Sequence, residues 1–236
     1  MMIGDTRKKM IPRWLKGVSI LLACLILFAG LVYAYDKPGG IADWRYSRAA
    51  GLEGTIQIPI GKTPEEAVQK FRSSSNLQIV HKESLHGGDL LFYKQNGIKD
   101  ENLGIEFVHK TWMGWKWVMG GGYAVSAPFE RKEAFSFMSM PKYKGITGPF
   151  PIIYGLILDS SITKINVTVG GTKAGSYPAS ITEYEPGQRL WYAELPASST
   201  APYKITATGD NGKVLAVKSF DDPTGYGSVA MSKSKT

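Results

Sequence analysis

Cysteine is almost absent from this 236-residue sequence, and the residue patterns that identify common enzymes are missing too. The single cysteine, Cys24, lies inside a long apolar run near the N-terminus. The roughly 200 residues after that run therefore hold neither a disulfide nor a thiolate metal site. A segment of this size can still bury a hydrophobic core of its own. We therefore expect a globular part that folds without covalent cross-links.

Catalytic motifs are the second absence. The sequence has no Gly-x-Ser-x-Gly nucleophile motif and no phosphate-binding loop, since Gly120-Gly121-Gly122 is not followed by Lys-Ser or Lys-Thr. A turn or a close approach of two backbones explains these glycines better. The histidines His81, His86 and His109 lack the helical spacing of a zinc-protease motif. The sequence therefore predicts no catalytic residue, no metal site and no cofactor, and it favours a protein that is not an enzyme.

Net positive charge is small outside the N-terminal segment. The formal net charge is +8, from 28 basic and 20 acidic residues. Five basic residues and one acidic residue precede the apolar run, which leaves about +4 on the remainder. Electrostatic binding of nucleic acid requires a clustered basic stripe, and none is visible in this pattern. We therefore expect no nucleic-acid partner.

An uncharged run of 19 residues extends from Gly17 to Tyr35. As a helix it is about 28 Å long, close to the ~30 Å hydrocarbon core of a bilayer. Basic residues precede it, and the positive-inside rule places such a tail in the cytoplasm. We therefore predict a cytoplasmic tail over 1–16, a transmembrane helix over 17–35 with the lipid bilayer as its partner, and an extracytoplasmic C-terminal part in a single-pass cell-membrane protein.

Two other interpretations of this run are weighed against an anchor. Val32-Tyr33-Ala34 has small residues at the spacing that signal peptidase accepts, but the apolar region of a signal peptide is usually about 7–15 residues long. Leu21-Leu22-Ala23-Cys24 resembles a lipoprotein box. A lipidated cysteine should be followed by a polar linker, whereas Leu25-Ile26-Leu27-Phe28 follows here. A retained signal-anchor helix is therefore favoured, and cleavage of the run stays open.

Turn-forming residues divide the rest of the chain into segments. We predict a linker and first strand over 36–61, with the strand at Thr55–Ile60, followed by an α+β unit over 62–123. A connector of uncertain structure covers 124–148. An all-β, sandwich-like unit of immunoglobulin-like architecture follows over 149–224, and a disordered tail rich in serine and lysine covers 225–236.

A helix start is the clearest local signal of the predicted α+β unit. Thr63 is a suitable N-cap, Pro64 suits the first helical position, and Glu66 completes a capping box. Hairpin patterns with glycine turns follow this short helix. The paired strands are expected at Leu77–Lys82 with Asp89–Lys94 and at Leu103–His109 with Trp115–Met119.

Five strand patterns predict the sandwich-like unit. Apolar and polar residues alternate in them, and Asp210-Asn211-Gly212 is a strong hairpin turn because Asn-Gly accepts positive φ at low cost. Strands at this spacing without helices are typical of a β-sandwich. They are expected at Ile152–Leu158, Ile162–Val169, Arg189–Leu195, Tyr203–Thr208 and Val214–Phe220.

Three tryptophans lie close together and form the candidate ligand or partner surface: Trp112, Trp115 and Trp117. In an extended strand, Trp115 and Trp117 share a face with the methionines on either side of them. Burial against Phe71 is the default for such a large apolar area. The alternative is an exposed aromatic platform for sugar rings or a partner protein. A β-bulge at Gly114 would change the parity and bring Trp112 to the same face.

Four short motifs resemble those of small membrane-anchored or exported proteins of Bacillus-type Gram-positive bacteria, a group with no assigned activity. They are Thr63-Pro64-Glu65-Glu66-Ala67, Leu90-Leu91-Phe92-Tyr93, Gly114-Trp115-Lys116-Trp117 and Tyr154-Gly155-Leu156. The resemblance covers about residues 55–220. It implies a cell-envelope location and an extracytoplasmic globular part, and it carries no catalytic residues.

Location and missing motifs together predict a class of function. We expect a membrane-tethered, extracytoplasmic binding or regulatory module of the cell envelope, without enzymatic activity. Its partner is expected to be an envelope protein or a cell-wall component. The alternative is an enzyme that acts on envelope polymers, or a carbohydrate-binding surface protein.

Overall fold

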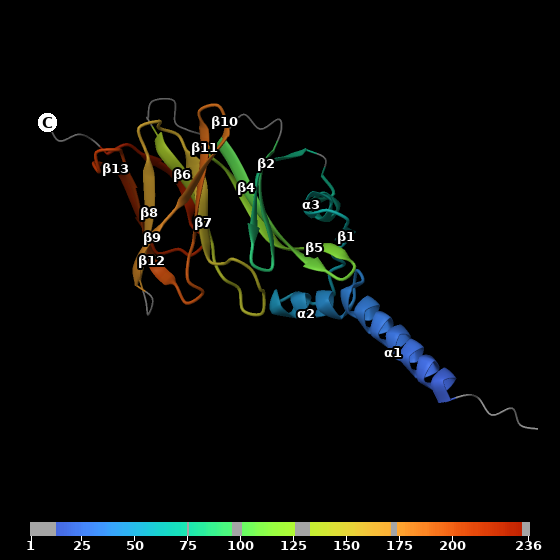
Figure 1. The fold of residues 1–236 in the computed structure, drawn as a ribbon. Coiled ribbons are helices and arrows are strands. Elements are labelled where there is room, and N and C mark those ends of the chain that lie inside the picture. The colour runs from blue at the N-terminus through green and yellow to red at the C-terminus, as the bar shows by residue number, and fades with distance from the viewer. Residues whose placement is uncertain (1–12, 75, 96–100, 126–132, 171–173, 233–236) are drawn as a thin grey trace, which may run out of the picture.

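An N-terminal helix extends away from a β-rich body in the computed structural model (Figure 1). This helix, α1, covers Arg13–Asp36. Among the residues described, it is the one helix that is long and apolar enough to cross a membrane, and its length and composition fit a membrane anchor or a signal sequence. Most of the predicted tail 1–16 lies outside the described residues. The structure describes residues 13–74, 76–95, 101–125, 133–170 and 174–232.

The β-rich body is mostly antiparallel and contains three sheets. The first sheet has the strand order β1-β5-β4-β3-β2, and each neighbouring pair in it is antiparallel. Its strands are β1 (Ile60–Gly61), β2 (Leu77–Leu85), β3 (Gly88–Gln95), β4 (Glu101–Thr111) and β5 (Gly114–Val125). Both hairpins of the predicted α+β unit are therefore confirmed.

The second and third sheets contain the remaining strands. The second sheet has the order β10-β11-β7-β6-β14 and the third has β13-β12-β8-β9. The second is built from β6 (Glu133–Met140), β7 (Ile152–Ile157), β10 (Ser180–Glu185), β11 (Gln188–Glu194) and β14 (Tyr226–Ala230). The third is built from β8 (Lys164–Gly170), β9 (Gly175–Pro178), β12 (Thr200–Thr208) and β13 (Val214–Phe220).

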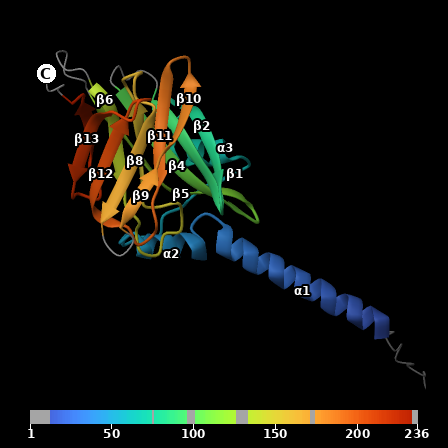
Figure 2. The same ribbon diagram turned by 60° about the vertical axis from the view of Figure 1, so that its left-hand side comes forward.

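The second sheet lies between the other two (Figures 1 and 2). Its strand β7 is buried at every position. Ile153 and Ile157 belong to the core that the second sheet shares with the third, whereas Tyr154 and Leu156 belong to the core shared with the first. A strand covered on both faces needs a continuous apolar run, which the sequence of β7 provides.

The core between the first and second sheets joins the two predicted units. Phe92 of β3 and Tyr192 of β11 are in contact there, with ring centroids 5.1 Å apart. Residues from 62–123 and from 149–224 therefore bury apolar surface against each other in one cluster. The predicted connector 124–148 contributes β6, which occupies an interior position in the second sheet.

Helix α3 (Pro64–Arg72) covers the outer face of the first sheet. The Thr63 hydroxyl accepts a hydrogen bond from the Glu66 backbone N–H at 3.1 Å, so the predicted N-cap is confirmed. The helix ends at Ser73, which adopts a left-handed conformation with φ of 50°. Phe71 stacks on Trp117 of β5, with ring centroids 3.8 Å apart, as the burial interpretation predicted.

The segment after α1 differs from the prediction for 36–61. It contains a helix, α2 (Ile41–Ala49), and the strand expected over Thr55–Ile60 is wrong, because β1 begins only at Ile60. The backbone N–H groups of Ile56 and Ile58 donate instead to side chains of α2. Donors used in this way are not available to a strand ladder.

The prediction of a disordered tail over 225–236 is wrong for its first part. Tyr226–Ala230 forms β14, which pairs with β6 at the edge of the second sheet. Val229 is buried in the core between the second and third sheets. This tail is polar in composition, but it contains one short strand with a single well-buried side chain. Residues 233–236 lie outside the described part of the chain.

A β-bulge in β5 decides which way its tryptophans and methionines face. Phe107 pairs with Met119 and Val108 pairs with Trp117, so Val118 is the extra residue on β5. Trp117 consequently packs with α3, and Met119 packs between the first and second sheets. The prediction that these two side chains share a face is therefore wrong. The bulge lies at Val118 and not at Gly114, which pairs regularly with Thr111.

Truncation of Trp117 should destabilise the protein much more than truncation of Trp112. Trp117 is 8% exposed and Trp112 is 80% exposed. We expect Trp117→Ala to lower the free energy of unfolding by about 3–5 kcal/mol, and Trp112→Ala to change it by no more than about 0.5 kcal/mol. Urea unfolding of the full chain in detergent, followed by circular dichroism, measures both. Equal losses in the two variants would contradict the assignment of Trp117 to the core.

Candidate functional site

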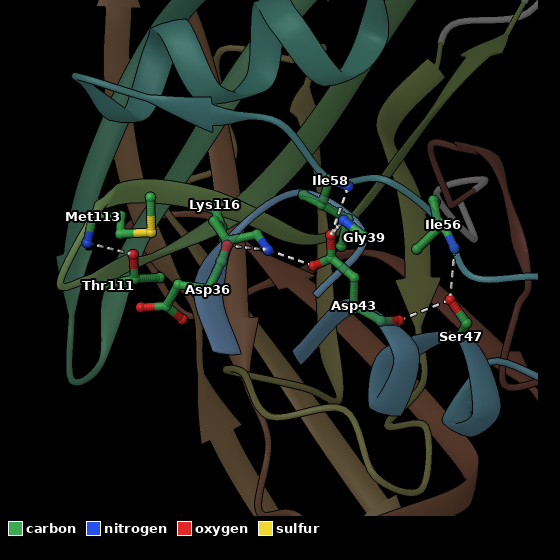
Figure 3. A network of polar contacts seen from close by, with 9 residues as sticks. All are labelled: Asp36, Gly39, Asp43, Ser47, Ile56, Ile58, Thr111, Met113 and Lys116. Carbon is green, nitrogen blue, oxygen red and sulfur yellow. Dashed lines mark hydrogen bonds and ion pairs between the residues drawn. The ribbon is translucent and has the colours of Figure 1, made fainter. Parts of the chain in front are cut away.

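A buried ion pair joins α1, α2 and the first sheet (Figure 3). Asp43 of α2 and Lys116 of β5 are in direct contact, and each side chain is only 2% exposed. The second Asp43 carboxylate oxygen accepts hydrogen bonds from the backbone N–H groups of Gly39 at 2.8 Å and Ile58 at 2.9 Å. Lys116 Nζ also donates to the carbonyl oxygen of Asp36, the last residue of α1, at 3.1 Å. We call these five residues the junction.

Local sequence explains how α2 carries this cluster. Asp43 lies in the first turn of α2, where a carboxylate interacts favourably with the helix dipole. One turn later, the Ser47 hydroxyl donates to the Asp43 carbonyl at 2.8 Å and accepts from the Ile56 N–H at 2.9 Å. One face of a short helix therefore satisfies the backbone donors of the segment that crosses it (Figure 3).

A second buried charge lies on the outer face of the first sheet, at Glu106 of β4. Its side chain is completely buried. Arg72 Nε, at the end of α3, donates to it at 2.8 Å, and Trp117 Nε1 donates at 2.5 Å. The Tyr93 hydroxyl is a third hydrogen-bond partner. A buried carboxylate with a cation and two neutral donors is electrostatically compensated.

Glycines make room for Glu106 and Tyr93. A Cβ on Gly120 would lie 1.8 Å from a Glu106 carboxylate oxygen, and a Cβ on Gly104 would lie 2.2 Å from the Tyr93 ring. Gly122 approaches the Tyr93 hydroxyl as well, at 3.1 Å from its Cβ position. The Gly120-Gly121-Gly122 run is therefore a site of close approach inside a strand, one of the two explanations that the sequence supports.

Burial and charge act against each other at this pair. Burial raises the pKa of Glu106, and hydrogen bonds from Arg72, Trp117 and Tyr93 offset part of that rise. Burial also lowers the pKa of Arg72, but the hydrogen bond and charge of Glu106 outweigh this effect and raise it. Burial followed by the Glu106 charge raises the pKa of Tyr93 to about 12, so its hydroxyl stays protonated and able to donate.

A polar pocket of about 290 Å³ opens beside this buried charge. Among the residues described, Arg72 makes its one hydrogen bond through Nε, so its two terminal amino groups have no hydrogen-bond partner there. The guanidinium also lies over the Trp117 ring, 5.6 Å from the centroid. The pocket is lined by Arg72, Tyr93, Gln95, Asn102, Leu103, Gly104, Gly121, Gly122, Tyr123 and Ala124.

A second pocket, of about 380 Å³, lies near α2 and is mainly apolar. Met119, Met138 and Met140 line it together with aromatic side chains that include Tyr46 and Tyr143. No charged side chain lines this pocket among the described residues. It therefore lacks a charged group that would pair with an ionic ligand, and the pocket beside Arg72 is the better candidate site for such a ligand.

The three candidate tryptophans do not form one surface. Trp117 is buried under α3, and Trp115 is partly buried at the edge of the same cluster. Trp112 lies at the tip of the β4–β5 hairpin and is largely exposed. Lys110 Nζ lies 6.0 Å from the centroid of the Trp115 ring. Of the three, Trp112 alone offers most of its side chain to a partner.

The histidines occupy separate places. His81 Nε2 lies 3.4 Å from Glu83, and His86 lies in the β2–β3 turn. His109 faces Lys116 across β4 and β5; burial and then the Lys116 charge lower its pKa, so it stays neutral at pH 7. Within the described ranges, no three His, Cys, Asp or Glu side chains lie close enough to hold a metal ion.

Sequence reasoning identified neither Arg72 nor Glu106 nor the junction as sites. Arg72 and Glu106 are 34 positions apart, and Asp43 and Lys116 are 73 apart, so no local motif connects either pair. The usable signal was glycine in the interior of two adjacent strands, which indicates that a bulky group lies over the sheet. These glycines indicate where the site lies, but they do not indicate that the group beside them is charged.

Removing Asp43 should destabilise the junction strongly. Asp43→Ala leaves Lys116 buried without its counter-ion and should lower the free energy of unfolding by about 3–5 kcal/mol. Amide hydrogen exchange should also accelerate at Gly39 and Ile58, which lose their acceptor. Lys70→Ala is the control, because Lys70 pairs with Glu66 at the surface and should cost at most about 1 kcal/mol. Unchanged exchange at Ile58 would refute the role of Asp43.

Removing Arg72 should make stability depend on the protonation of Glu106. Arg72→Ala should cost about 3–5 kcal/mol at neutral pH, because Glu106 is left buried and unpaired. The pKa of Glu106 then rises further, so the folded state binds a proton that the unfolded state has released. The free energy of unfolding should therefore increase as pH is lowered from neutral towards about pH 5.

The double variant Arg72→Ala/Glu106→Gln is the control for this prediction. It removes the titrating group and should lose that pH dependence, while regaining part of the stability at neutral pH. Thermal melting of both variants across this pH range, compared with the unsubstituted chain, measures the effect. A pH profile that is the same for the single and double variants would contradict ionisation of Glu106 as the cause.

Comparison with known proteins finds no relative for this chain. No family model, no curated protein and no solved structure matches it. Function therefore has to follow from the chemistry of the junction and of the polar pocket.

Proposed function

We propose that this protein is a membrane-tethered, extracytoplasmic binding module of the cell envelope that acts without catalysing a reaction. The length and apolar surface of α1 support the tether. The basic residues before α1 support a cytoplasmic N-terminus, which places the β-rich body outside the cytoplasm. We further propose that the second and third sheets form a β-sandwich, since they face each other across a shared core.

The Arg72 guanidinium is the single observation that carries the binding proposal. Its Nε is held by Glu106, Arg72 lines the polar pocket, and its terminal amino groups have no hydrogen-bond partner among the described residues. A guanidinium fixed at one nitrogen loses little further freedom when its remaining N–H groups bind an anion. The site is therefore organised before a ligand arrives.

Carboxylate is the ligand chemistry that fits this arrangement. Two parallel N–H groups of an arginine match the two oxygens of a carboxylate. The polar residues Tyr93, Gln95 and Asn102 line the same pocket. A volume of about 290 Å³ suits a short acidic group and not a large ligand. The proposed ligand is a carboxylate-bearing part of a cell-wall component or of an envelope protein.

The pocket lies at the end of the first sheet that is remote from α1. Gly104 lines it, and Trp112 marks the opposite end of the same β4–β5 hairpin. Eight residues separate these positions along β4, which corresponds to roughly 26 Å. With α1 in a membrane, the pocket therefore faces away from the bilayer, towards the cell wall.

Titration with soluble peptidoglycan fragments tests this proposal. The full chain in detergent should bind fragments with free carboxylates and should not bind the same fragments after amidation. Arg72→Lys keeps the charge but loses the paired N–H groups, and should weaken binding roughly tenfold or more. Lys70→Ala, two residues before Arg72 on α3, is the matched control and should bind normally. Equal affinity of the Arg72→Lys variant would refute the site.

A further inference from the structure

The tip of the β4–β5 hairpin contacts α1 inside its apolar run. The rings of Trp112 and Phe28 meet edge to face, with centroids 5.7 Å apart and planes at 86°. Trp112 is nevertheless 80% exposed, and its neighbour Met113 is 38% exposed. Two large apolar side chains are thus presented beside a helix that itself has an apolar surface.

The position of Phe28 on α1 sets the depth of this contact. Phe28 lies seven residues before Tyr35, the last residue of the uncharged run, which corresponds to about 10 Å along the helix axis. With α1 across a bilayer, Phe28 lies below the boundary between headgroups and hydrocarbon. A ring in contact with Phe28 from the side is then surrounded by lipid and not by water.

The junction holds the hairpin at this depth. Lys116 lies on β5 near the turn, and its ammonium group donates to the carbonyl of Asp36 at the end of α1. Within the turn, the Met113 N–H donates to the Thr111 hydroxyl at 3.1 Å (Figure 3). A polar group that is satisfied internally is less costly to move out of water. One polar group of the turn is therefore already hydrogen-bonded within the protein, which lowers the cost of placing the turn in lipid.

A basic side chain borders the apolar tip on the side of the body. Lys110 lines a crevice of about 530 Å³ between the hairpin and α1, together with Asp36, the neutral His109 and the apolar Leu31 and Val32. Lysine stems can lie along apolar surface while the ammonium group reaches the headgroups.

We infer that the β4–β5 hairpin tip is a second membrane contact, in which Trp112 and Met113 insert among the lipids of the leaflet next to α1. This inference rests on the part of the proposed function in which α1 spans the membrane, and it is independent of the pocket. The body is then held to the bilayer at two points, and its orientation relative to the membrane is fixed.

Site-specific fluorescence quenching tests the insertion in the full chain. The chain is reconstituted in vesicles of phosphatidylcholine with a minority of phosphatidylglycerol. In a Cys24→Ser background, Met113→Cys carries an environment-sensitive fluorophore. We expect loss of its fluorescence when the lipids carry nitroxide groups on their acyl chains, and protection from iodide in the water. Trp112→Cys provides a second label position if Met113→Cys disturbs folding.

Two further labels separate the hairpin from the anchor. The native Cys24 in α1 reports whether that helix lies in lipid. Pro186→Cys reports the turn between β10 and β11, at the end of the body away from α1 (Figure 1). Quenching by lipid at Cys24 and Met113, with iodide quenching at Pro186→Cys, supports the inference. Lipid quenching at Cys24 together with no lipid quenching at either Met113→Cys or Trp112→Cys overturns the inference, while the membrane anchor remains supported. No lipid quenching at Cys24 overturns the anchor, and the inference with it.

Discussion

The ion pair between Lys116 and Asp43 determines how the chain leaves α1 and enters the sheet. Both groups are almost fully buried, so each depends on the other for compensation of its charge. The pair also uses its remaining hydrogen-bonding capacity on backbone atoms of three other segments, at Asp36, Gly39 and Ile58. One contact therefore organises the end of a helix, a turn and an extended segment that would otherwise carry unsatisfied polar groups.

Strand β5 supplies this contact and much of the candidate site as well. Lys116 belongs to the junction, and Trp117 next to it packs under α3 and donates to Glu106. The bulge at Val118 then reverses which face the following residues occupy. Glycines 120–122 come directly after the bulge and leave the face beside β4 open for Glu106 and Tyr93. A strand with strictly alternating side chains and no glycines could not provide both Lys116 for the junction and the space that Glu106 and Tyr93 occupy.

Local patterns predicted the elements whose causes are local. The Thr63 cap, the hairpins around Gly87 and Gly114, and the five strands expected after residue 149 all have counterparts in the structure. Strands that depend on distant partners were not predicted, because an irregular segment over 141–151 separates β6 from β7 and β14 lies in a polar tail. Helix α2 was missed for the same reason, since its interactions are with residues 55–59 and with β5.

The candidate site was predictable in outline only. Interior glycines in β5 indicated a close approach, but the identity of the approaching groups depends on a fold that brings α3 over the first sheet. The tryptophan cluster was the stronger sequence signal, and the structure distributes it over two environments. Trp115 and Trp117 pack in the apolar cluster under α3. Trp112 lies in the turn, where side chains no longer alternate between the two faces of a strand.

Two ion pairs, one fully buried and one with a partly exposed arginine, fix the positions of α2 and α3 on the first sheet. Apolar packing holds α3 on the first sheet through Ala67 and Val68, but such packing is non-directional and tolerates sliding. The buried side chains of α2 are instead the polar Asp43 and Ser47. Arg72 fixes the end of α3 against Glu106 on β4, and Asp43 fixes α2 against Lys116 on β5. Neither contact survives a shift of one residue, since the displaced charge would be buried alone. Because β4 and β5 are one continuous hairpin, the pocket at one end and the apolar tip at the other are held at a constant separation. If the tip inserts in the membrane as proposed, Arg72 lies at a constant height above the bilayer.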